Sequence, residues 1–157
     1  MHAPLVPADP DFAARVRESF ARQGFMALLG ATITRVEPGL VEIEAPFRGD
    51  LTQQHGYFHA GVTSALADTA GGYAGYTLFP ADSSVLTVEF KINLLAPAQG
   101  HRLSARGRVV KSGRTLTVCA LDVFALDGAG DAGDGAKRTL CASGQQTLIC
   151  LHGRADA

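Results

Sequence analysis

Residues 61–79 constrain the fold of this chain more than any other segment. They read GVTSALADTAGGYAGYTLF, so small or apolar residues occur on every side and the only charge is Asp68. A helix without a polar face is a buried helix, and the central charge and limited length argue against a bilayer span. The three glycines at 71, 72 and 75 each cost such a helix about 1 kcal/mol relative to alanine. We therefore predict a buried central helix that another backbone approaches closely, most simply a sheet wrapped around it.

Alternating apolar and polar residues on both sides of this segment predict β-strands. Before it, residues 30–45 alternate with a period of two and are divided by a Pro38-Gly39 turn. After it, the run 86–94 places its apolar residues on one face and its polar residues, Thr87 among them, on the other. The remaining predicted strands cover residues 103–109, 115–125 and 138–148, with a turn at 111–114 and a glycine- and aspartate-rich loop at 127–135. One helix followed by an antiparallel meander indicates an α+β fold.

A short helix is predicted near the N-terminus, over about residues 10–23. Asp9 can cap it, Pro10 fits its first position, and Gly24 marks its end. An apolar stripe runs along one face of this segment at positions 12, 16 and 20. No internal repeat or linker divides the chain, so we predict a single domain over residues 1–157, with a core over about 28–150.

Composition and charge exclude several classes of partner. Charged residues make up 18% of the chain and the net charge is −1, which predicts no binding to nucleic acid and no membrane association. A surface this poor in charge indicates that a partner subunit covers part of it. The three cysteines form neither an even framework nor a CxxC pair, and the N-terminus lacks the pattern of a signal peptide. We therefore expect reduced thiols and a cytoplasmic protein.

Asp68 needs an explanation, because a carboxylate in the middle of a buried helix is costly. A structural acid held by hydroxyl groups and a functional acid are both compatible with this position. Just before the helix, the polar loop 53–61 leads to the unpaired backbone N–H groups of a helix N-terminus, which can polarise a carbonyl group. Two helical turns, about 10–12 Å, separate these donors from the acid within one chain. A symmetric dimer with antiparallel helices brings one chain's acid to the other chain's donors.

These residues resemble a known family. His59-Ala60-Gly61 followed by Ala65-Leu66-Ala67-Asp68 is similar to the HGG(x)nLAD segment of hotdog-fold acyl-CoA thioesterases of the PaaI-like family. The resemblance runs from about Leu28 to Leu148, and Ala60 replaces the first glycine of the family motif. It implies a hotdog fold, in which an antiparallel sheet wraps around one long helix. It also implies hydrolysis of an acyl-CoA thioester to a free acid and coenzyme A.

The resemblance further implies roles for individual residues. Asp68 would act as the general base or the nucleophile, and Gln53 would orient the water or the carbonyl group. The backbone N–H of Ala60, with that of Gly61, would hold the oxyanion. Further expected contributions come from Thr87, which would fix the water, and from His59, which would orient the loop or contact the carbonyl group. A purely structural role for His59 stays open. In the family the acid and the oxyanion donors come from different subunits, so we expect a homodimer, assembled as a dimer of dimers.

Other residues are candidates for binding the substrate. Phe58, Tyr73, Tyr76 and Phe90 would line the acyl tunnel, although aromatic residues of this kind also pack in cores. The hairpin turn with Lys111, Gly113 and Arg114 would contact the phosphates of coenzyme A, as in related proteins. No metal is expected, because His55 and His59 have no third ligand nearby. No cofactor is expected either, since coenzyme A enters as part of the substrate.

The acyl group is less constrained than the reaction. The apolar central helix favours a medium- or long-chain acyl group. An aromatic acyl group of the phenylacetyl type is the alternative within the same reaction. A regulatory protein that binds acyl-CoA without hydrolysing it is a further alternative, but such a protein would have no need for an acid at position 68. The sequence therefore favours an enzyme.

Overall fold

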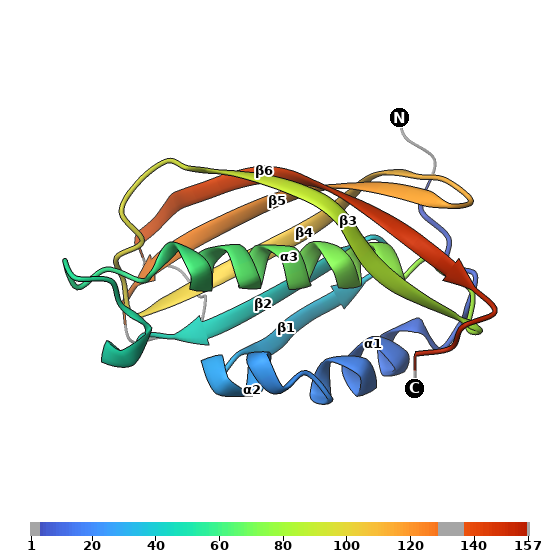
Figure 1. Ribbon diagram of the computed structural model, residues 1–157, viewed down its shortest axis with the longest axis horizontal. Helices are drawn as coiled ribbons and strands as arrows, with labels where there is room; N and C mark the ends of the chain where they lie inside the picture. The colour runs from blue at the N-terminus through green and yellow to red at the C-terminus, as the bar shows by residue number, and fades with distance from the viewer. Residues whose placement is uncertain (1–3, 129–136, 157) are drawn as a thin grey trace.

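The computed structural model describes residues 4–128 and 137–156, which form a curved six-stranded sheet around one long helix (Figure 1). The sheet order is β1-β2-β4-β5-β6-β3, and every neighbouring pair is antiparallel. The predicted α+β architecture, with a sheet wrapped around the central helix α3, is confirmed. The elements are α1 (Phe12–Ala21), α2 (Gly24–Leu29), β1 (Thr32–Glu37), β2 (Leu40–Pro46), the short 3-10 helix η1 (Gly49–Leu51), α3 (Ala60–Tyr76), β3 (Ser83–Leu94), β4 (Arg102–Ser112), β5 (Leu116–Asp127) and β6 (Lys137–His152). The predicted loop at 127–135 lies largely outside the described residues.

Helix α3 packs so closely on the sheet that a Cβ atom on either of two of its glycines would overlap side chains of the sheet. A Cβ atom on Gly71 would lie 2.0 Å from Oε1 of Gln146 and 2.4 Å from Cδ2 of Leu121. A Cβ atom on Gly75 would lie 2.4 Å from Cδ1 of Leu148. Gly72, by contrast, has no such neighbour within 4 Å. The predicted close approach of another backbone is confirmed at Gly107 of β4, where a Cβ atom would lie 2.3 Å from the backbone oxygen of Ala70 and 2.4 Å from the backbone nitrogen of Gly71. Among the described helices, α3 included, none is long and apolar enough to cross a membrane.

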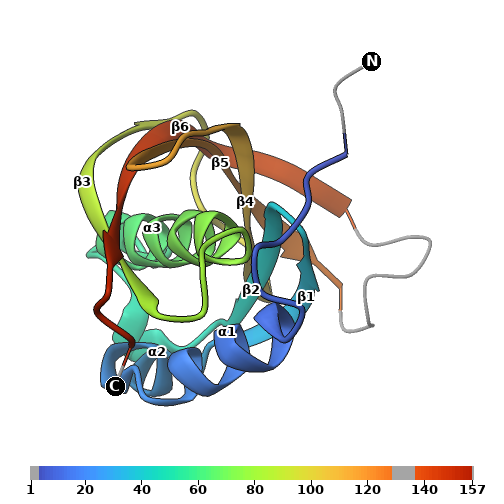
Figure 2. The same cartoon turned by 90° about the vertical axis from the view of Figure 1, so that its right-hand side faces the viewer.

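The N-terminal region differs from its prediction, because two helices replace one. Helix α1 ends at Ala21, and Gly24 begins α2 instead of ending the first helix. Gly30, with φ of 67°, ends α2 in the left-handed conformation that glycine adopts without strain. The buried side chains Met26 and Leu29 explain the second helix, since they add apolar contacts that a periodicity starting at residue 12 did not include. Figure 2 shows α1 and α2 filling the gap between the two edges of the curved sheet, beneath α3.

Strand β3 also differs from its prediction, because a β-bulge interrupts its alternation. Thr87 pairs with Leu148 and Glu89 pairs with Thr147, so Val88 is an extra residue in the ladder. Thr87 therefore shares the face that turns toward α3 with Phe90, whose partner across the ladder is the buried Gln146. The prediction that Thr87 and Phe90 lie on opposite faces was wrong. The bulge directs the Thr87 hydroxyl toward the central helix.

The close packing of α3 predicts opposite effects for two neighbouring glycines. Gly71→Ala should lower the free energy of unfolding by about 1–3 kcal/mol, because its methyl group overlaps atoms of a packed core. Gly72→Ala, the matched control, should raise it by up to about 1 kcal/mol, because alanine favours the helix. Urea unfolding of both variants checks this. Equal stability of the two variants would contradict the helix–sheet contact described above.

Candidate active site

Asp68 lies two turns into α3 and is half-buried against the sheet. Its Oδ1 accepts a hydrogen bond from Oγ1 of Thr87 at 2.7 Å and another from Nε2 of Gln146 at 2.5 Å. The residue also lines a cavity of about 510 Å³. Both donors come from the sheet, Thr87 from edge strand β3 and Gln146 from the adjacent β6. The structure thus places Thr87 beside the acid, as the sequence predicted.

Gln146 is the residue of this site that the sequence analysis missed. Its side chain is 1% exposed, and its Nε2 also lies 3.0 Å from the backbone oxygen of Asp68 and 2.9 Å from Oγ1 of Thr87. A signal for it existed, because Gln146 falls between two small or apolar positions, 144 and 148, on the inward face of β6. A polar side chain on the core face of a strand needs partners. Here the partners are the acid and its hydroxyl neighbour.

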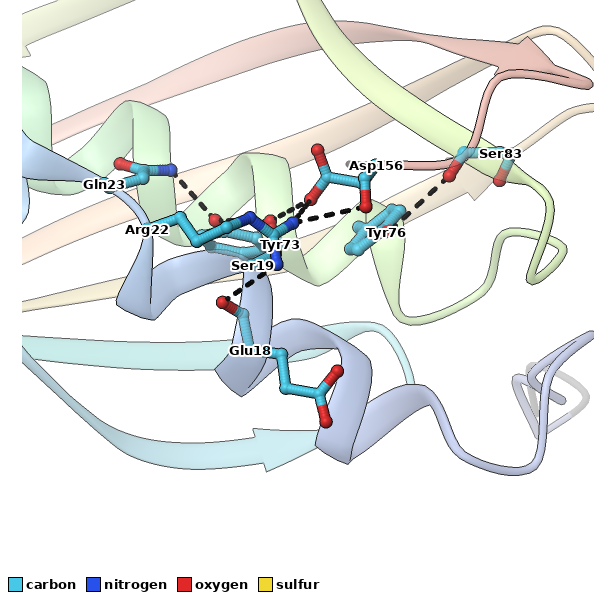
Figure 3. Close-up of polar contacts among 8 residues, drawn as sticks. All are labelled: Glu18, Ser19, Arg22, Gln23, Tyr73, Tyr76, Ser83 and Asp156. Carbon is cyan, nitrogen blue, oxygen red and sulfur yellow. Dashed lines mark hydrogen bonds and ion pairs between the residues drawn. The ribbon is translucent and has the colours of Figure 1, made fainter.

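Part of the wall of the Asp68 cavity is polar and is formed by Ser19, Arg22, Gln23, Tyr73 and Asp156. Figure 3 shows the contacts among these residues. The hydroxyl group of Tyr73 lies 3.0 Å from Oγ of Ser19 and accepts a hydrogen bond of 3.0 Å from Nε2 of Gln23. Nη2 of Arg22 forms an ion pair of 2.9 Å with Asp156 on the same wall. Burial raises the pKa of Tyr73, so its phenol stays neutral at physiological pH. Much of this wall comes from Ser19 of α1 and from Arg22 and Gln23 at the junction of α1 and α2, a contribution that the sequence did not indicate.

The four predicted aromatic residues differ in their positions. Tyr73 lines the Asp68 cavity, as expected for a residue that contacts the substrate. Tyr76 is 1% exposed and packs in the core, with ring contacts to Tyr73 and Phe79. Phe90 lies on the edge strand β3, 44% exposed, and is not among the residues that line either cavity beside the helix. Phe58 belongs to the second cavity.

This second cavity, of about 440 Å³, lies at the N-terminus of α3. It brings Gln53 and Ala60 together, as the sequence predicted. Most of its remaining wall is apolar: Tyr57, Phe58, Leu94, Leu95, Ala96, Pro97, Ala98 and Cys141, with Thr63 in addition. Phe58 itself is 3% exposed and its ring meets that of Phe47 edge-on, at 5.3 Å between centroids. A helix N-terminus thus opens into an apolar pocket.

The two predicted oxyanion donors are not equivalent. His59 caps α3, and its Nδ1 accepts a hydrogen bond of 2.8 Å from the backbone N–H of Gly61. The N–H of Ala60 donates to no atom of the described chain. Ala60 has ordinary helical backbone angles, since no non-glycine residue in the described ranges has a positive φ. Alanine can therefore replace glycine here without strain, and its N–H is the free donor.

Gln53 is held in place by the loop that precedes α3. Its backbone N–H donates to the oxygen of Tyr57 at 2.9 Å, and its Oε1 accepts from the N–H of His55. The tight turn uses Gly56, whose φ is 81°. Because Oε1 is engaged, the amide nitrogen is the end of Gln53 that can reach a ligand in the cavity.

One protomer does not bring the acid and the free donor together. The cavity at Asp68 and the cavity at Ala60 share no lining residue. Asp68 follows Ala60 by eight positions in α3, which corresponds to about 12 Å along the helix axis. A single thioester carbonyl cannot contact both. The geometry agrees with the sequence argument for a site built from two chains.

The hairpin between β4 and β5 lies outside both cavities. Lys111, Gly113 and Arg114 are exposed there. The N–H of Gly113 closes the turn on the oxygen of Leu116 at 2.9 Å, and Nε2 of His152 lies 2.8 Å from the oxygen of Arg114. Their predicted contact with coenzyme A stays a prediction, because the protomer alone places them far along the sheet from Ala60.

The comparisons with known proteins agree on one family. Residues 55–132 match the family model described as the thioesterase superfamily. The solved structure of a thioesterase family protein from Silicibacter pomeroyi is 46% identical to this chain, with a TM-score of 0.84, covering 90% of this chain and 99% of that one. This chain belongs to the thioesterase superfamily.

Two further proteins are similar to this chain. The proofreading thioesterase EntH of Klebsiella pneumoniae is 32% identical over 89 residues, which is 57% of this chain and 65% of that protein. The PaaI protein of E. coli has a TM-score of 0.78 over 94% of this chain and 99% of its own, and at 16% identity that likeness shows the fold alone. The fold is the hotdog thioesterase fold that the sequence predicted, and hydrolysis of thioesters is the activity of the superfamily.

The cysteines do not supply a nucleophile to this site. Burial raises the pKa of Cys119 to about 12 and also raises the pKa values of Cys141 and Cys150. A thiol is neutral below its pKa, and the thiolate is the reactive form. All three thiols are free and buried.

We therefore expect the native protein to resist a disulfide reagent such as DTNB at pH 8. The three thiols should react at least about 100-fold faster after unfolding in guanidinium, because only the unfolded chain exposes them and restores their ordinary pKa values. The absorbance of the released thiolate measures both rates. Rapid labelling of one thiol in the folded protein would contradict the burial described here.

Proposed function

We propose that the protein hydrolyses an acyl-CoA thioester to a free carboxylic acid and coenzyme A. The observation that carries the proposal is the environment of Asp68. Its carboxylate lines a cavity, and two donors from the sheet hold one of its oxygens. A carboxylate held this way can activate water as a base or attack a carbonyl carbon as a nucleophile.

The proposed reaction uses the second cavity for the carbonyl group. The thioester oxygen accepts a hydrogen bond from the N–H of Ala60, where the α3 dipole adds partial positive charge. Gln53 lies in the same cavity and orients the carbonyl group or the water. As water attacks, Asp68 takes its proton; the C–S bond then breaks and the thiolate of coenzyme A leaves. Attack by Asp68 itself would first give a mixed anhydride, which water then hydrolyses. Water is the only co-reactant in either route.

The proposal requires a homodimer, since Asp68 and Ala60 must come from different chains. The edge strand β3 supports such an assembly. Its outer edge pairs with no strand of the described residues, and large apolar side chains on it are more than 40% exposed: Leu86, Val88, Phe90 and Leu94. An open apolar edge is a site where another strand can pair. We propose that a second copy pairs along β3 and that dimers associate further into a dimer of dimers.

The apolar cavity at Ala60 is the better place for the acyl group. Burying an alkyl chain against the polar wall of the Asp68 cavity would strand hydrogen-bonding groups. The cavity at Ala60 instead offers Phe58, Leu94 and Leu95, which suits a medium- or long-chain acyl group. The edge-on pair of Phe47 and Phe58 also suits an aromatic acyl group, so a phenylacetyl-type substrate is the second candidate.

Other aspects of the proposal rest on single observations. A regulatory protein that only binds acyl-CoA would have no use for a carboxylate with two aligned donors in its cavity, so we favour an enzyme. Free, buried cysteines suit a reducing compartment, so we place the reaction in the cytoplasm. The hairpin with Lys111 and Arg114 is our candidate contact for the phosphates of coenzyme A.

The first test is Asp68→Asn, assayed by release of free thiol from phenylacetyl-, octanoyl- and palmitoyl-CoA. The variant should lose at least about 100-fold in rate, because the amide can act neither as a base nor as a nucleophile. It should fold normally, since its oxygen can still accept the two hydrogen bonds. Asp82→Asn is the matched control, because Asp82 is exposed and lines neither cavity.

The rates of the wild-type protein with the three substrates also show whether aliphatic or aromatic acyl groups are preferred. The proposal fails if the Asn variant hydrolyses thioesters as fast as the wild type. Tight binding of acyl-CoA without any thiol release would support the regulatory alternative instead.

A further inference from the structure

Gln146 is a long polar side chain with almost no contact with solvent. It is 1% exposed, and it extends from β6 to the underside of α3. All the hydrogen bonds described for its amide nitrogen go to two residues. Nε2 lies 2.5 Å from Oδ1 of Asp68, 3.0 Å from the backbone oxygen of Asp68 and 2.9 Å from Oγ1 of Thr87. Its donor end therefore serves the acid and the hydroxyl group beside it.

The acceptor end of the same side chain is unsatisfied. Oε1 of Gln146 is buried and has no hydrogen-bond partner among the described residues. Oε1 lies against Gly71 of α3, where a Cβ atom would be only 2.0 Å from it. An amide retained for stability would satisfy both of its ends. In Gln146 the carbonyl oxygen is unpaired, and the absence of a Cβ atom on Gly71 provides the space for it. A buried polar group without a partner is typical of residues kept for function.

The three side chains form a closed triangle around one oxygen. The Thr87 hydroxyl donates its proton to Oδ1 of Asp68, so its oxygen is free to accept from Nε2 of Gln146. Nε2 also donates to Oδ1, which thus receives two hydrogen bonds. Oδ2 receives none from the described part of the chain. Oδ2 is therefore the carboxylate oxygen left free to accept a hydrogen bond from a water molecule.

We infer that Gln146 is a positioning residue for the proposed hydrolysis: together with Thr87 it immobilises Oδ1 of Asp68, so that Oδ2 is the atom that reacts. The inference rests on the proposed function. Gln146 acts through Asp68 and does not touch the substrate. The contact of Gln146 Nε2 with the backbone oxygen of Asp68 also links this turn of α3 to β6. Side chain and main chain of the acid are thus held from one point on the sheet.

The test is Gln146→Met, which keeps the length of the side chain and removes its donor. We expect kcat to fall about tenfold or more with KM within about threefold of the wild type, because the acid loses its orientation in the transition state while substrate contacts are unchanged. Gln145→Met is the matched control, since its side chain lies exposed on the opposite face of β6. This control should keep wild-type kcat and KM.

Two further variants keep the inference testable if Gln146→Met folds poorly. Gly71→Ala leaves Gln146 in the chain but places a methyl group where its Oε1 lies, and it should lower kcat in the same way. Thr87→Val removes the other donor to Oδ1. In the double variant Gly71→Ala with Thr87→Val, the loss of kcat should be smaller than the product of the two single losses, because both changes act on the hydrogen bonds to Oδ1 of Asp68.

The outcomes separate the inference from the proposed function. A kcat for Gln146→Met equal to that of Gln145→Met, with Asp68→Asn inactive, overturns the role of Gln146 and leaves the hydrolysis intact. A raised KM with unchanged kcat also overturns it, since that pattern belongs to a substrate contact. A wild-type protein that releases no thiol from any thioester in the series overturns the proposed function, and the inference with it.

Discussion

Asp68 sits on a helix that has no polar face, and the rest of the site follows from how that charge is accommodated. Among the described residues, both hydrogen-bond donors to the carboxylate come from the sheet, Thr87 from β3 and Gln146 from β6. Each contact depends on a local feature of the fold. The bulge at Val88 turns Thr87 toward the helix, and Gly71 leaves room for Gln146. A bulge of β3 and a glycine of α3 thus both serve the hydrogen bonds to one oxygen atom of Asp68.

The length of α3 imposes the second constraint. The acid and the free N–H of Ala60 lie about 12 Å apart on the same helix, each in its own cavity. Neither cavity is complete as a site for the proposed hydrolysis, since one holds the proposed base and the other the proposed carbonyl donor. An antiparallel copy of the same helix resolves this, because it exchanges the two ends. The unpaired apolar edge of β3 is the surface on which such a copy can pair.

The central helix and the position of Asp68 on it were predictable from residues close together in the chain, and the resemblance to the family predicted that Gln53 and Ala60 lie near each other. The composition of residues 61–79 predicts a buried helix, and the loop before it leads directly to the helix N-terminus. The bulge at Val88 was not predictable, because period-two alternation contains no information about an extra residue in one strand. The role of Gln146 was not predicted for a related reason. Its contact with Asp68 depends on the register of β6 against β3 and on Gly71 of α3, which is far from Gln146 in the sequence. The break between α1 and α2 likewise follows from tertiary contacts of Met26 and Leu29.

The central claim is that one site uses the acid of one chain and the helix N-terminus of the other. Coexpression of two inactive chains tests it most directly: Asp68→Asn lacks the base, and Ala60→Pro lacks the oxyanion donor while keeping a residue that suits the first helical position. Random pairing makes half the dimers mixed, and each mixed dimer then has one site with both defects and one with neither. The account predicts recovery of thiol release to about a quarter of the wild-type rate. Mixed dimers that form, as shown by affinity tags on the two chains, and yet remain as inactive as either parent would contradict the account.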